Sequence, residues 1–319
     1  MIIQTRKPAP IVVYVYNRPE HFKKCLDALA ANPLAKQSEL YVVSDGAARI
    51  EHQPAVDKVR EIALSAKGFL KVHPMFRETN WGVYASATTA DREVVENHGK
   101  IICLEDDILV APSFLEFINS GLDFFEGDKR IYSVAGYCHP ISFPTDYSAP
   151  YWLSLVHMPW GFGTWRDRYM SMDPSWNPLE AIKKNWRVYG KMFRYCTWIS
   201  LLLEADARGQ VVAGDARVIG QMLLKGQLSV VPRVSRAKNI GLDGSGLHCG
   251  LNPEGDGVTL VNNLDEVLFS SNLDVDYRIV KTLNSRICSP SVRIKAVMEA
   301  LGVMNIAQRT KRNLKLIRR

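Results

Sequence analysis

The sequence predicts an α/β fold with a mostly parallel central sheet flanked by helices. Short apolar runs of strand length recur along the chain, and segments with apolar residues three or four apart separate them. Hydrophobic residues make up 47% of the 319 positions, which is enough for a large core. Strands and helices that alternate at these lengths are typical of βαβ units, whose strands pair in parallel.

Strand and helix signals alternate clearly through the first 137 residues. The run IVVYVY is continuous, apolar and rich in β-branched residues, which is typical of a buried parallel strand. The segment HFKKCLDALAANP has apolar residues at helical spacing, with a proline beyond the last of them. We expect strands at 11–16, 39–46, 69–78, 101–107 and 131–137, and helices at 21–33, 54–66, 80–99 and after Pro112.

The second half of the chain is less regular. Residues 142–176 are aromatic and show no clear period, and helical spacing returns at 180–208. Residues 209–226 predict a turn followed by a helix, and residues 228–235 predict a strand. The glycine-rich stretch at 239–257 is too polar to be a core element, so we expect a loop there.

The net charge of +7 is concentrated at the C-terminus. Residues 281–319 hold ten Lys and Arg against one acid, whereas the other 280 residues hold 30 basic and 32 acidic groups. A nearly neutral body argues against a groove for nucleic acid. The basic tail has two interpretations, a solvated helix or tail and an amphipathic segment in contact with anionic lipid.

The sequence shows no signal for secretion or membrane insertion. No run of 18 apolar residues occurs, and the N-terminal MIIQTRKPAP lacks an apolar core of signal-peptide length. The six cysteines form no CxxC pair and several lie in apolar runs, so we expect reduced core residues. We therefore expect a cytoplasmic protein, with the tail as a candidate contact at the inner face of the membrane.

Three consecutive carboxylates, Glu105, Asp106 and Asp107, follow the apolar strand IICL. Adjacent like charges raise one another's pKa unless a cation or solvent compensates. Side chains alternate along a strand, so we expect 105 and 107 to point one way and 106 the other. One direct ligand to Mg²⁺ or Mn²⁺, with the other carboxylates on metal-bound water or a ligand hydroxyl, satisfies this geometry. The alternative is an acidic loop that caps the helix beginning near Pro112.

Several motifs in a fixed order give a family resemblance. YVYNRPEHFKKCLDAL, SDG, EDD, WGFGTWRDR and NIGLDGSGLH together resemble nucleotide-sugar-dependent glycosyltransferases of the GT-A fold, over about residues 10 to 250. One similar group is the bacterial family 2-like group of surface polysaccharide assembly, which carries a WGWATW-like segment. Another is the eukaryotic N-acetylglucosaminyltransferase family that initiates complex N-glycan branching, whose DxD motif reads EDD.

The resemblance implies roles around the nucleotide-sugar donor. Asp107 would ligate the metal, and His248 of the glycine-rich loop would approach the metal or the diphosphate. A nucleoside diphosphate brings charge that carboxylates repel, and a metal bridges the two. Asn80 is either a donor contact or only a helix N-cap. The remaining donor contacts would be made by Arg18 to the nucleotide or diphosphate, Asp45 to base or ribose, and Glu105 and Asp106 to ribose, sugar or metal-bound water.

The resemblance also implies an acceptor side. Asp215 occupies the place of the general base, although Gly214 stands where relatives often carry Trp, and an N-cap role is the alternative. Aromatic rings cover the flat faces of sugars, so acceptor contacts are expected at Trp160, Trp165, Arg166 and Asp243. Core packing is the alternative for Trp165.

The expected activity is inverting, metal-dependent transfer from a nucleotide-diphospho-sugar, with UDP favoured, to a glycan or lipid-linked acceptor. The expected organisation is one GT-A domain at 1–280, with a nucleotide half at about 1–135 and an acceptor half at about 136–280, followed by a basic helical extension at 281–319. A metal-dependent nucleotidyltransferase is one alternative, but no glycine-rich phosphate loop stands near residues 11–20. A non-catalytic protein that binds carbohydrate or a lipid surface is the other.

Overall fold

A computed structural model describes residues 7–244, 256–261, 267–271 and 273–300. The chain divides into two compact units. The first comprises Met1–Pro140, Asp146–Met172 and Gln227–Val275, and the second comprises Ile141–Thr145, Asp173–Gly226 and Asp276–Arg319. This division differs from the expected halves, because the chain enters the second unit and returns to the first.

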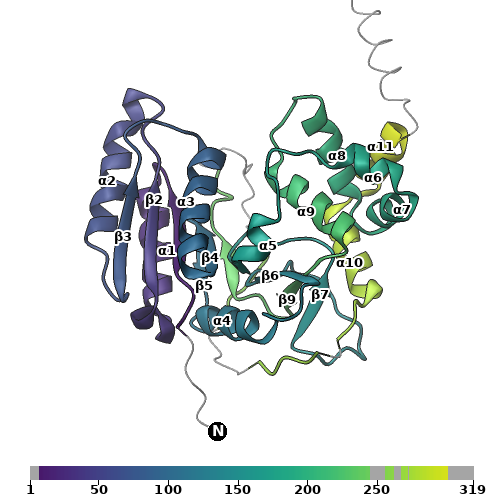
Figure 1. Ribbon diagram of the computed structural model, residues 1–319, viewed down its shortest axis with the longest axis horizontal. Coiled ribbons are helices and arrows are strands. Elements are labelled where there is room, and N and C mark those ends of the chain that lie inside the picture. Colours follow the sequence, from purple (N-terminus) through teal and green to yellow (C-terminus); the bar gives the residue numbers. More distant parts are fainter. Residues whose placement is uncertain (1–6, 245–255, 262–266, 272, 301–319) are drawn as a thin grey trace, which may run out of the picture. The chain divides into compact units, whose positions relative to one another are not determined.

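The first unit is built on a mixed sheet of eight strands (Figure 1). Their order is β3-β2-β1-β4-β8-β6-β9-β7. Strands β1 to β4, β6 and β9 run in one direction, whereas β7 and β8 run antiparallel to their neighbours. The bounds are β1 Ile11–Val15, β2 Glu39–Ser44, β3 Lys71–Phe76, β4 Lys100–Glu105, β6 Ile131–Ala135, β7 Tyr151–Ser154, β8 Phe162–Trp165 and β9 Leu228–Pro232. The predicted α/β class with a large, mostly parallel sheet is confirmed.

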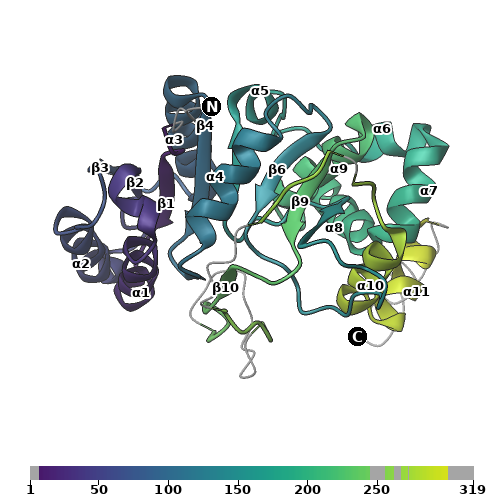
Figure 2. The same ribbon diagram turned by 90° about the horizontal axis from the view of Figure 1, so that it is seen from below.

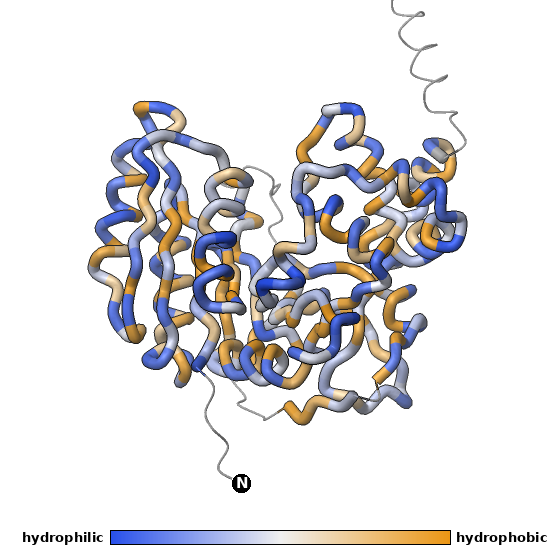
Figure 3. Tube along the Cα trace, viewed as in Figure 1, coloured by the Kyte–Doolittle hydropathy of each residue, from blue (hydrophilic) through white to orange (hydrophobic). Residues whose placement is uncertain are grey.

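Helices cover both faces of this sheet because its central strands are apolar on both sides. Val13 and Leu104 face the core shared with α1 (Pro19–Ala30), α2 (Gln53–Leu64) and α4 (Phe114–Phe124). Val12 and Cys103, one residue away in each strand, face α3 (Val83–His98) instead. Figure 2 shows α3 across the sheet from α1 and α2, and Figure 3 shows the apolar character of the central strands.

Two short elements lie beside the end of β4. Strand β5 (Ile108–Val110) pairs antiparallel with β10 (Ala237–Asn239), so the start of the glycine-rich segment is tied to the segment after the carboxylates. The region expected to be irregular, 142–176, contains β7, β8 and α5 (Arg166–Met170). The WGFGTW segment is therefore largely a central strand and not a loop, because its small and aromatic residues fill the position between β4 and β6.

The second unit is helical, with α6 (Leu179–Lys184), α7 (Trp186–Tyr195), α8 (Thr197–Ala207), α9 (Gly214–Lys225), α10 (Tyr277–Ile287) and α11 (Pro290–Ala300). Ile182, Met192, Leu203 and Leu283 lie in its interior. The expected boundary of the basic extension, residue 281, falls inside α10, which is packed into this unit. Residues 301–319 of the predicted tail lie outside the described residues.

The five cysteines that the structure describes are buried and free, as expected. In the same part of the chain, no helix is both long and apolar enough to cross a membrane.

Candidate active site

The candidate site lies at the carboxyl edge of the first unit's parallel strands, where ligands bind in open α/β sheets. Strand register brings the three predicted segments together there. Tyr14 of β1 is opposite Glu105 of β4, and Val15 is opposite Ser44 of β2. The segments that follow therefore leave the same edge, and they carry Arg18, Asp45, Asp106 and Asp107.

The carboxylate triplet divides at the end of β4. Glu105 is the last residue of the strand and is exposed, whereas Asp106 and Asp107 form a turn and are only 6% and 4% exposed. The expected alternation of 105 and 107 against 106 stops here, because the strand ends at Glu105. Both aspartates instead approach the same cation.

That cation is Arg18, which stands at the N-cap of α1 with Pro19 in the first helical turn. Its Nη1 donates to Asp107 Oδ2 at 2.8 Å and lies 3.6 Å from Asp106 Oδ1. Burial and the charge of Asp107 raise the pKa of Asp106 to about 7, and Arg18 opposes that rise. The pKa of the Arg18 guanidinium itself is raised by these aspartates, against the effect of burial.

The pair keeps unused hydrogen-bonding groups. Arg18 Nε and Nη2 are buried and make no hydrogen bond with described residues, and Asp107 Oδ1 is buried in the same condition. Buried polar atoms without partners are rare in native proteins and call for an explanation such as a bound ion or ligand. The free donors would suit an anion, and the free carboxylate oxygen would suit a cation or a hydroxyl.

The segment after β10 closes over this pair. The Ile240 amide donates to the Asp107 carbonyl at 2.9 Å, and the Gly241 amide donates to Asn239 Oδ1 at 2.7 Å. A Cβ atom at Gly241 would lie 1.9 Å from Asp107 Oδ2, so only glycine fits. The structure thus brings the predicted loop onto Asp107, the aspartate that the sequence predicts as a metal ligand. His248 lies outside the described residues.

Asp243 joins the same network. Its Oδ1 is 3.9 Å from Arg18 Nη2, and its Oδ2 is 3.1 Å from His21 Nε2. An acceptor contact was expected at Asp243. In the structure its carboxylate contacts Arg18 and His21, and these contacts hold the loop to the start of α1. Sequence reasoning missed His21, although it belongs to the quoted motif YNRPEH and lies one helical turn after Arg18.

Asp45 fixes the neighbouring loop through hydrogen bonds to three backbone amides. Its carboxylate accepts hydrogen bonds from the amides of Gly46 at 3.0 Å, Trp81 at 2.9 Å and Gly82 at 2.8 Å. Asn80 Nδ2 donates to the Gly46 carbonyl at 2.8 Å. Helix α3 has Gly82 at its N-cap, so the alternative of Asn80 as an N-cap is not what the structure shows. Both residues stand at the site edge, but these bonds use much of their polar capacity.

Trp160 lies at the site end of β8. Because β8 is antiparallel to β4, Phe162 pairs with Cys103 near the carboxyl end of β4. Trp160 is half-buried and packs edge-on against Tyr137, with ring centroids 4.6 Å apart, and near His139. These three rings follow β6 or precede β8, so they belong to the edge that carries Arg18. The contribution of Tyr137 and His139 was not predicted.

Trp165 and Arg166 lie at the opposite edge. Trp165 pairs with Lys100 at the start of β4, and the Arg166 amide donates to the Gly99 carbonyl. Five residues of β4 separate this end from Glu105, which is about 17 Å. Of the two roles considered for Trp165, the structure shows core packing: it is 3% exposed, and its Nε1 donates to the Leu122 carbonyl at 3.0 Å. The expected acceptor contacts at Trp165 and Arg166 are therefore corrected, because an antiparallel strand cannot place both ends of WGFGTWR at the edge where Trp160 lies.

Asp215 belongs to the second unit. It lies in the first turn of α9, whose N-cap is Ala213, so Asp215 is not the N-cap residue of this helix. Asp215 is solvent-exposed, yet the protein packed around its carboxyl raises its pKa. The neighbouring acid Asp206 accepts hydrogen bonds from Arg217 on both carboxylate oxygens, each at 2.8 Å. Glu204 is likewise paired, with Lys183 at 2.9 Å.

The described residues fit a metal only with help from a ligand. No group of three or more His, Cys, Asp or Glu side chains that could hold an ion occurs in the described part of the chain. Asp107 Oδ1 offers one free, buried oxygen. Mg²⁺ and Mn²⁺ sites that use one or two carboxylates take their remaining oxygen ligands from water and substrate phosphates. The residues therefore fit a divalent ion that is bound jointly with a diphosphate.

No protein-family model matches the sequence, and no curated protein matches it. Solved structures resemble parts of the chain. A mannosyltransferase from Pyrobaculum calidifontis in complex with GDP-Man and Mn²⁺ is 16% identical over 51% of this chain and 46% of that one, with a TM-score of 0.36. Residues 1–349 of S. aureus TarS are 12% identical over 72% of this chain and 59% of that one, with a TM-score of 0.40. The glycosyltransferase GlyE of Streptococcus pneumoniae is 11% identical over 70% and 45%, with a TM-score of 0.36.

This chain spans roughly half the length of these three structures. The function proposed for it therefore rests on its own site.

Proposed function

We propose that this chain is an inverting, divalent-metal-dependent glycosyltransferase that moves a sugar from a nucleotide-diphospho-sugar to a glycan or lipid-linked acceptor. One observation supports this most directly. At the carboxyl edge of the sheet, a buried carboxylate oxygen of Asp107 and two buried guanidinium nitrogens of Arg18 make no hydrogen bond with described residues, although the two side chains contact each other. A metal-bound diphosphate presents the matching pair of charges.

The donor would be held by residues of the first unit. Asp107 would ligate Mn²⁺ or Mg²⁺, and Arg18 would bind the diphosphate through its free N–H groups. Asp106 and Glu105 would contact ribose, sugar or metal-bound water. Asp45 and Asn80 would shape the nucleotide side by fixing the loop at 79–82. The bound metal would supply Lewis-acid stabilisation of the departing diphosphate.

The acceptor would be activated by Asp215, which would take the proton of the attacking hydroxyl as general base. A pKa raised by its surroundings brings a carboxylate closer to the range in which a base works well near neutral pH. Displacement at the anomeric carbon would invert its configuration in one step. Trp160 would cover an apolar sugar face, a role that suits a half-buried ring at the site edge.

A thermal-shift panel tests the proposal. The full chain is heated with UDP-, GDP-, dTDP- and CMP-sugars, each with and without Mn²⁺, and a ligand that binds the native state raises the Tm. We expect one nucleotide sugar, with UDP favoured, to stabilise the protein in the presence of Mn²⁺. Asp107→Ala should lose this response, and Asp27→Asn, an exposed aspartate in an ion pair on α1, should keep it. No response to any nucleotide sugar would end the proposal.

Further assays address the alternatives. Release of pyrophosphate from a nucleoside triphosphate and a sugar phosphate would indicate a nucleotidyltransferase. Binding of glycan or lipid without any nucleotide response would indicate a non-catalytic binding protein.

We also propose that the protein acts in bacterial surface polysaccharide synthesis and contacts the membrane through its basic tail. The structure alters the test of this contact. A truncation at residue 281 would cut α10, in which Ile279, Val280 and Leu283 are buried. Truncation after Ala300 leaves α10 and α11 intact. We expect the full chain to float with liposomes that contain anionic lipid, and the truncated chain to float less. Equal flotation of the two chains would exclude a membrane contact through the tail.

A further inference from the structure

Three aspartates surround one arginine at the candidate site. Arg18 Nη1 is 2.8 Å from Asp107 and 3.6 Å from Asp106, and its Nη2 is 3.9 Å from Asp243. The side chain of Arg18 is only 14% exposed. The group that neutralises the proposed metal ligand in this structure is therefore a residue of the chain itself.

This arrangement has an electrostatic cause. Asp106 and Asp107 are adjacent and buried, and two buried carboxylates need a positive charge nearby if both are to ionise. Arginine remains charged under all ordinary conditions, and its planar guanidinium can contact both carboxylates. Arg18 thus supplies the cation that the pair requires before any ligand arrives.

The same contact opposes a metal ion that arrives alone. The ion would meet the positive charge of Arg18 beside Asp107, and Gly241 is packed directly over Asp107 Oδ2. If the ion displaced Arg18, the guanidinium would lose its only hydrogen bond among the described residues, because Nε and Nη2 make none. A diphosphate removes this cost because it offers Arg18 new anionic oxygens.

We propose that Arg18 couples metal binding to nucleotide binding. Without nucleotide, its guanidinium occupies the Asp106–Asp107 pair. When a nucleotide binds, the guanidinium transfers to the diphosphate and leaves Asp107 free for the metal. This inference rests on the proposed function and adds to it a reason why the ion and the nucleotide bind together.

A simpler role for Arg18 predicts a different result. If Arg18 only binds the diphosphate, its removal weakens nucleotide binding and leaves the affinity for the ion alone unchanged. If Arg18 also occupies the metal position, its removal strengthens binding of the ion alone. Because coupling between two ligands is reciprocal, the loss of Arg18 should also reduce how much each ligand assists the other.

The experiment measures Mn²⁺ binding by the full chain, from the electron paramagnetic resonance signal of free Mn²⁺. This binding measurement does not depend on enzymatic turnover. Mn²⁺ is titrated with and without the nucleoside diphosphate of the sugar donor that stabilises the protein, into wild type, Arg18→Ala and Arg18→Gln. Arg49→Ala, an exposed arginine on the segment after β2, is the matched control.

In wild type and in Arg49→Ala we expect weak Mn²⁺ binding that the nucleotide strengthens by about tenfold or more, within the usual range of coupling between two ligands. In both Arg18 variants we expect Mn²⁺ alone to bind at least about fivefold more tightly, with a smaller effect of nucleotide. Unchanged or weaker binding of Mn²⁺ alone to both variants would overturn the proposal.

A second measurement tests whether the variants fold. Circular dichroism melts establish which variants are folded, and Arg18→Gln keeps most of the side-chain volume if Arg18→Ala does not fold. Failure of this inference leaves coupled Mn²⁺ and nucleotide binding in wild type intact. Failure of the proposed function appears instead as no nucleotide binding by wild type at all.

Discussion

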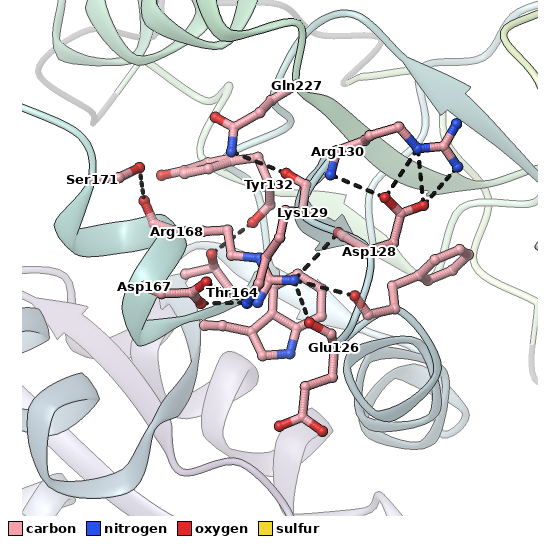
Figure 4. Close-up of polar contacts among 12 residues, drawn as sticks. Glu126, Asp128, Lys129, Arg130, Tyr132, Thr164, Asp167, Arg168, Ser171 and Gln227 are labelled. Carbon is pink, nitrogen blue, oxygen red and sulfur yellow. Dashed lines mark hydrogen bonds and ion pairs between the residues drawn. The ribbon is translucent and has the colours of Figure 1, made fainter.

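Two arginines with little exposed side chain lie at opposite edges of the same sheet and have opposite roles. Arg168, in α5 directly after β8, is 2% exposed, and its Nη2 donates to the carbonyl groups of Phe125, Glu126 and Asp128 at 3.3, 2.5 and 3.3 Å. Its guanidinium also lies over the Trp165 ring, 4.2 Å from the centroid. Figure 4 shows Arg168 beside Glu126 and Asp128. Arg18, at the carboxyl edge, faces carboxylates instead.

The difference lies in what each arginine binds. Arg168 Nη2 binds backbone carbonyls at and just beyond the C-terminal end of α4, which the helix cannot satisfy itself and which carry its negative dipole end. Its Nη1 also donates to the adjacent side chain of Asp167 at 2.8 Å. The carbonyl groups cannot leave, so this part of the contact is permanent. The partners of Arg18 are ionisable side chains, and a ligand of suitable charge can take the place of either member. A buried arginine therefore marks a ligand site only where its partners can be exchanged.

Asp107→Asn should give the largest effect. The substitution keeps the shape of the side chain but removes the charge that would hold the metal, and loss of such a metal contact costs several kcal/mol of transition-state stabilisation. We expect the initial rate of sugar transfer to fall by about 10³ or more, since about 4 kcal/mol corresponds to that factor. Asp27→Asn should retain the wild-type rate. A rate above about a tenth of wild type would place the metal elsewhere.

Arg168→Ala should come next, with an effect on stability. It leaves the carbonyl groups beyond α4 without their donor in a buried place and removes the ring contact with Trp165. We expect the free energy of unfolding in urea to fall by about 3 kcal/mol, which is in the range for loss of a buried hydrogen-bonded network. Exposed Arg166 is the matched control, and Arg166→Ala should change stability by less than about 0.5 kcal/mol. A raised KM for the acceptor in Arg166→Ala would instead support the role first expected for it.

The two edges also show which parts of the molecule the sequence could predict. The segment YNRPEH, the SDG turn and the aspartates end parallel strands, and parallel strands deliver their carboxyl ends to one edge without further information. The register of β1 with β2 and β4 fulfilled that expectation. The α/β class followed from the same local signals.

The position of the WGFGTW segment was harder to predict, because the edge that each residue reaches depends on the direction in which the strand runs. Nothing in six residues shows that β8 enters the sheet antiparallel between β4 and β6. That pairing sends Trp160 and Trp165 to different edges. The ion pair of His21 with Asp243 was missed for a related reason: 222 residues separate them, and only the tertiary fold brings the loop onto α1.

Asp91 sharpens the comparison, since it is a buried carboxylate whose described partners include no arginine. Tyr14 and Tyr169 donate to it at 2.5 and 3.0 Å, and burial nevertheless raises its pKa to about 6. The unfolded value is about 4. The folded state therefore binds the proton more tightly, so stability contributed by the protonated form is lost as pH rises from about 4 through about 6.

Asp91→Asn should remove this pH dependence. Two pKa units correspond to about 3 kcal/mol, taken as an upper figure. The free energy of unfolding of wild type relative to Asp91→Asn should thus fall by about 2 kcal/mol between pH 4.5 and pH 7. Urea unfolding at several pH values measures it. Parallel pH profiles for the two proteins would show that Asp91 does not titrate in this range.

Substitutions of Trp160 and Trp165, which lie toward opposite ends of β8, should have the smallest effects. One should change the acceptor KM and the other the free energy of unfolding. Trp165→Phe removes the hydrogen bond from the indole N–H to the Leu122 carbonyl and leaves a small cavity. We therefore expect a loss of about 1–2 kcal/mol in unfolding free energy and an unchanged acceptor KM. Trp160→Ala removes a half-buried ring at the site edge, and loss of a sugar-facing ring should raise the acceptor KM by about fivefold to tenfold, which is about 1 kcal/mol. Urea unfolding and steady-state kinetics on both variants provide the four numbers needed. If Trp165→Phe raised KM while Trp160→Ala did not, the acceptor would lie at the edge occupied by Arg168, and the division of the sheet into a ligand edge and a structural edge would have to be reversed.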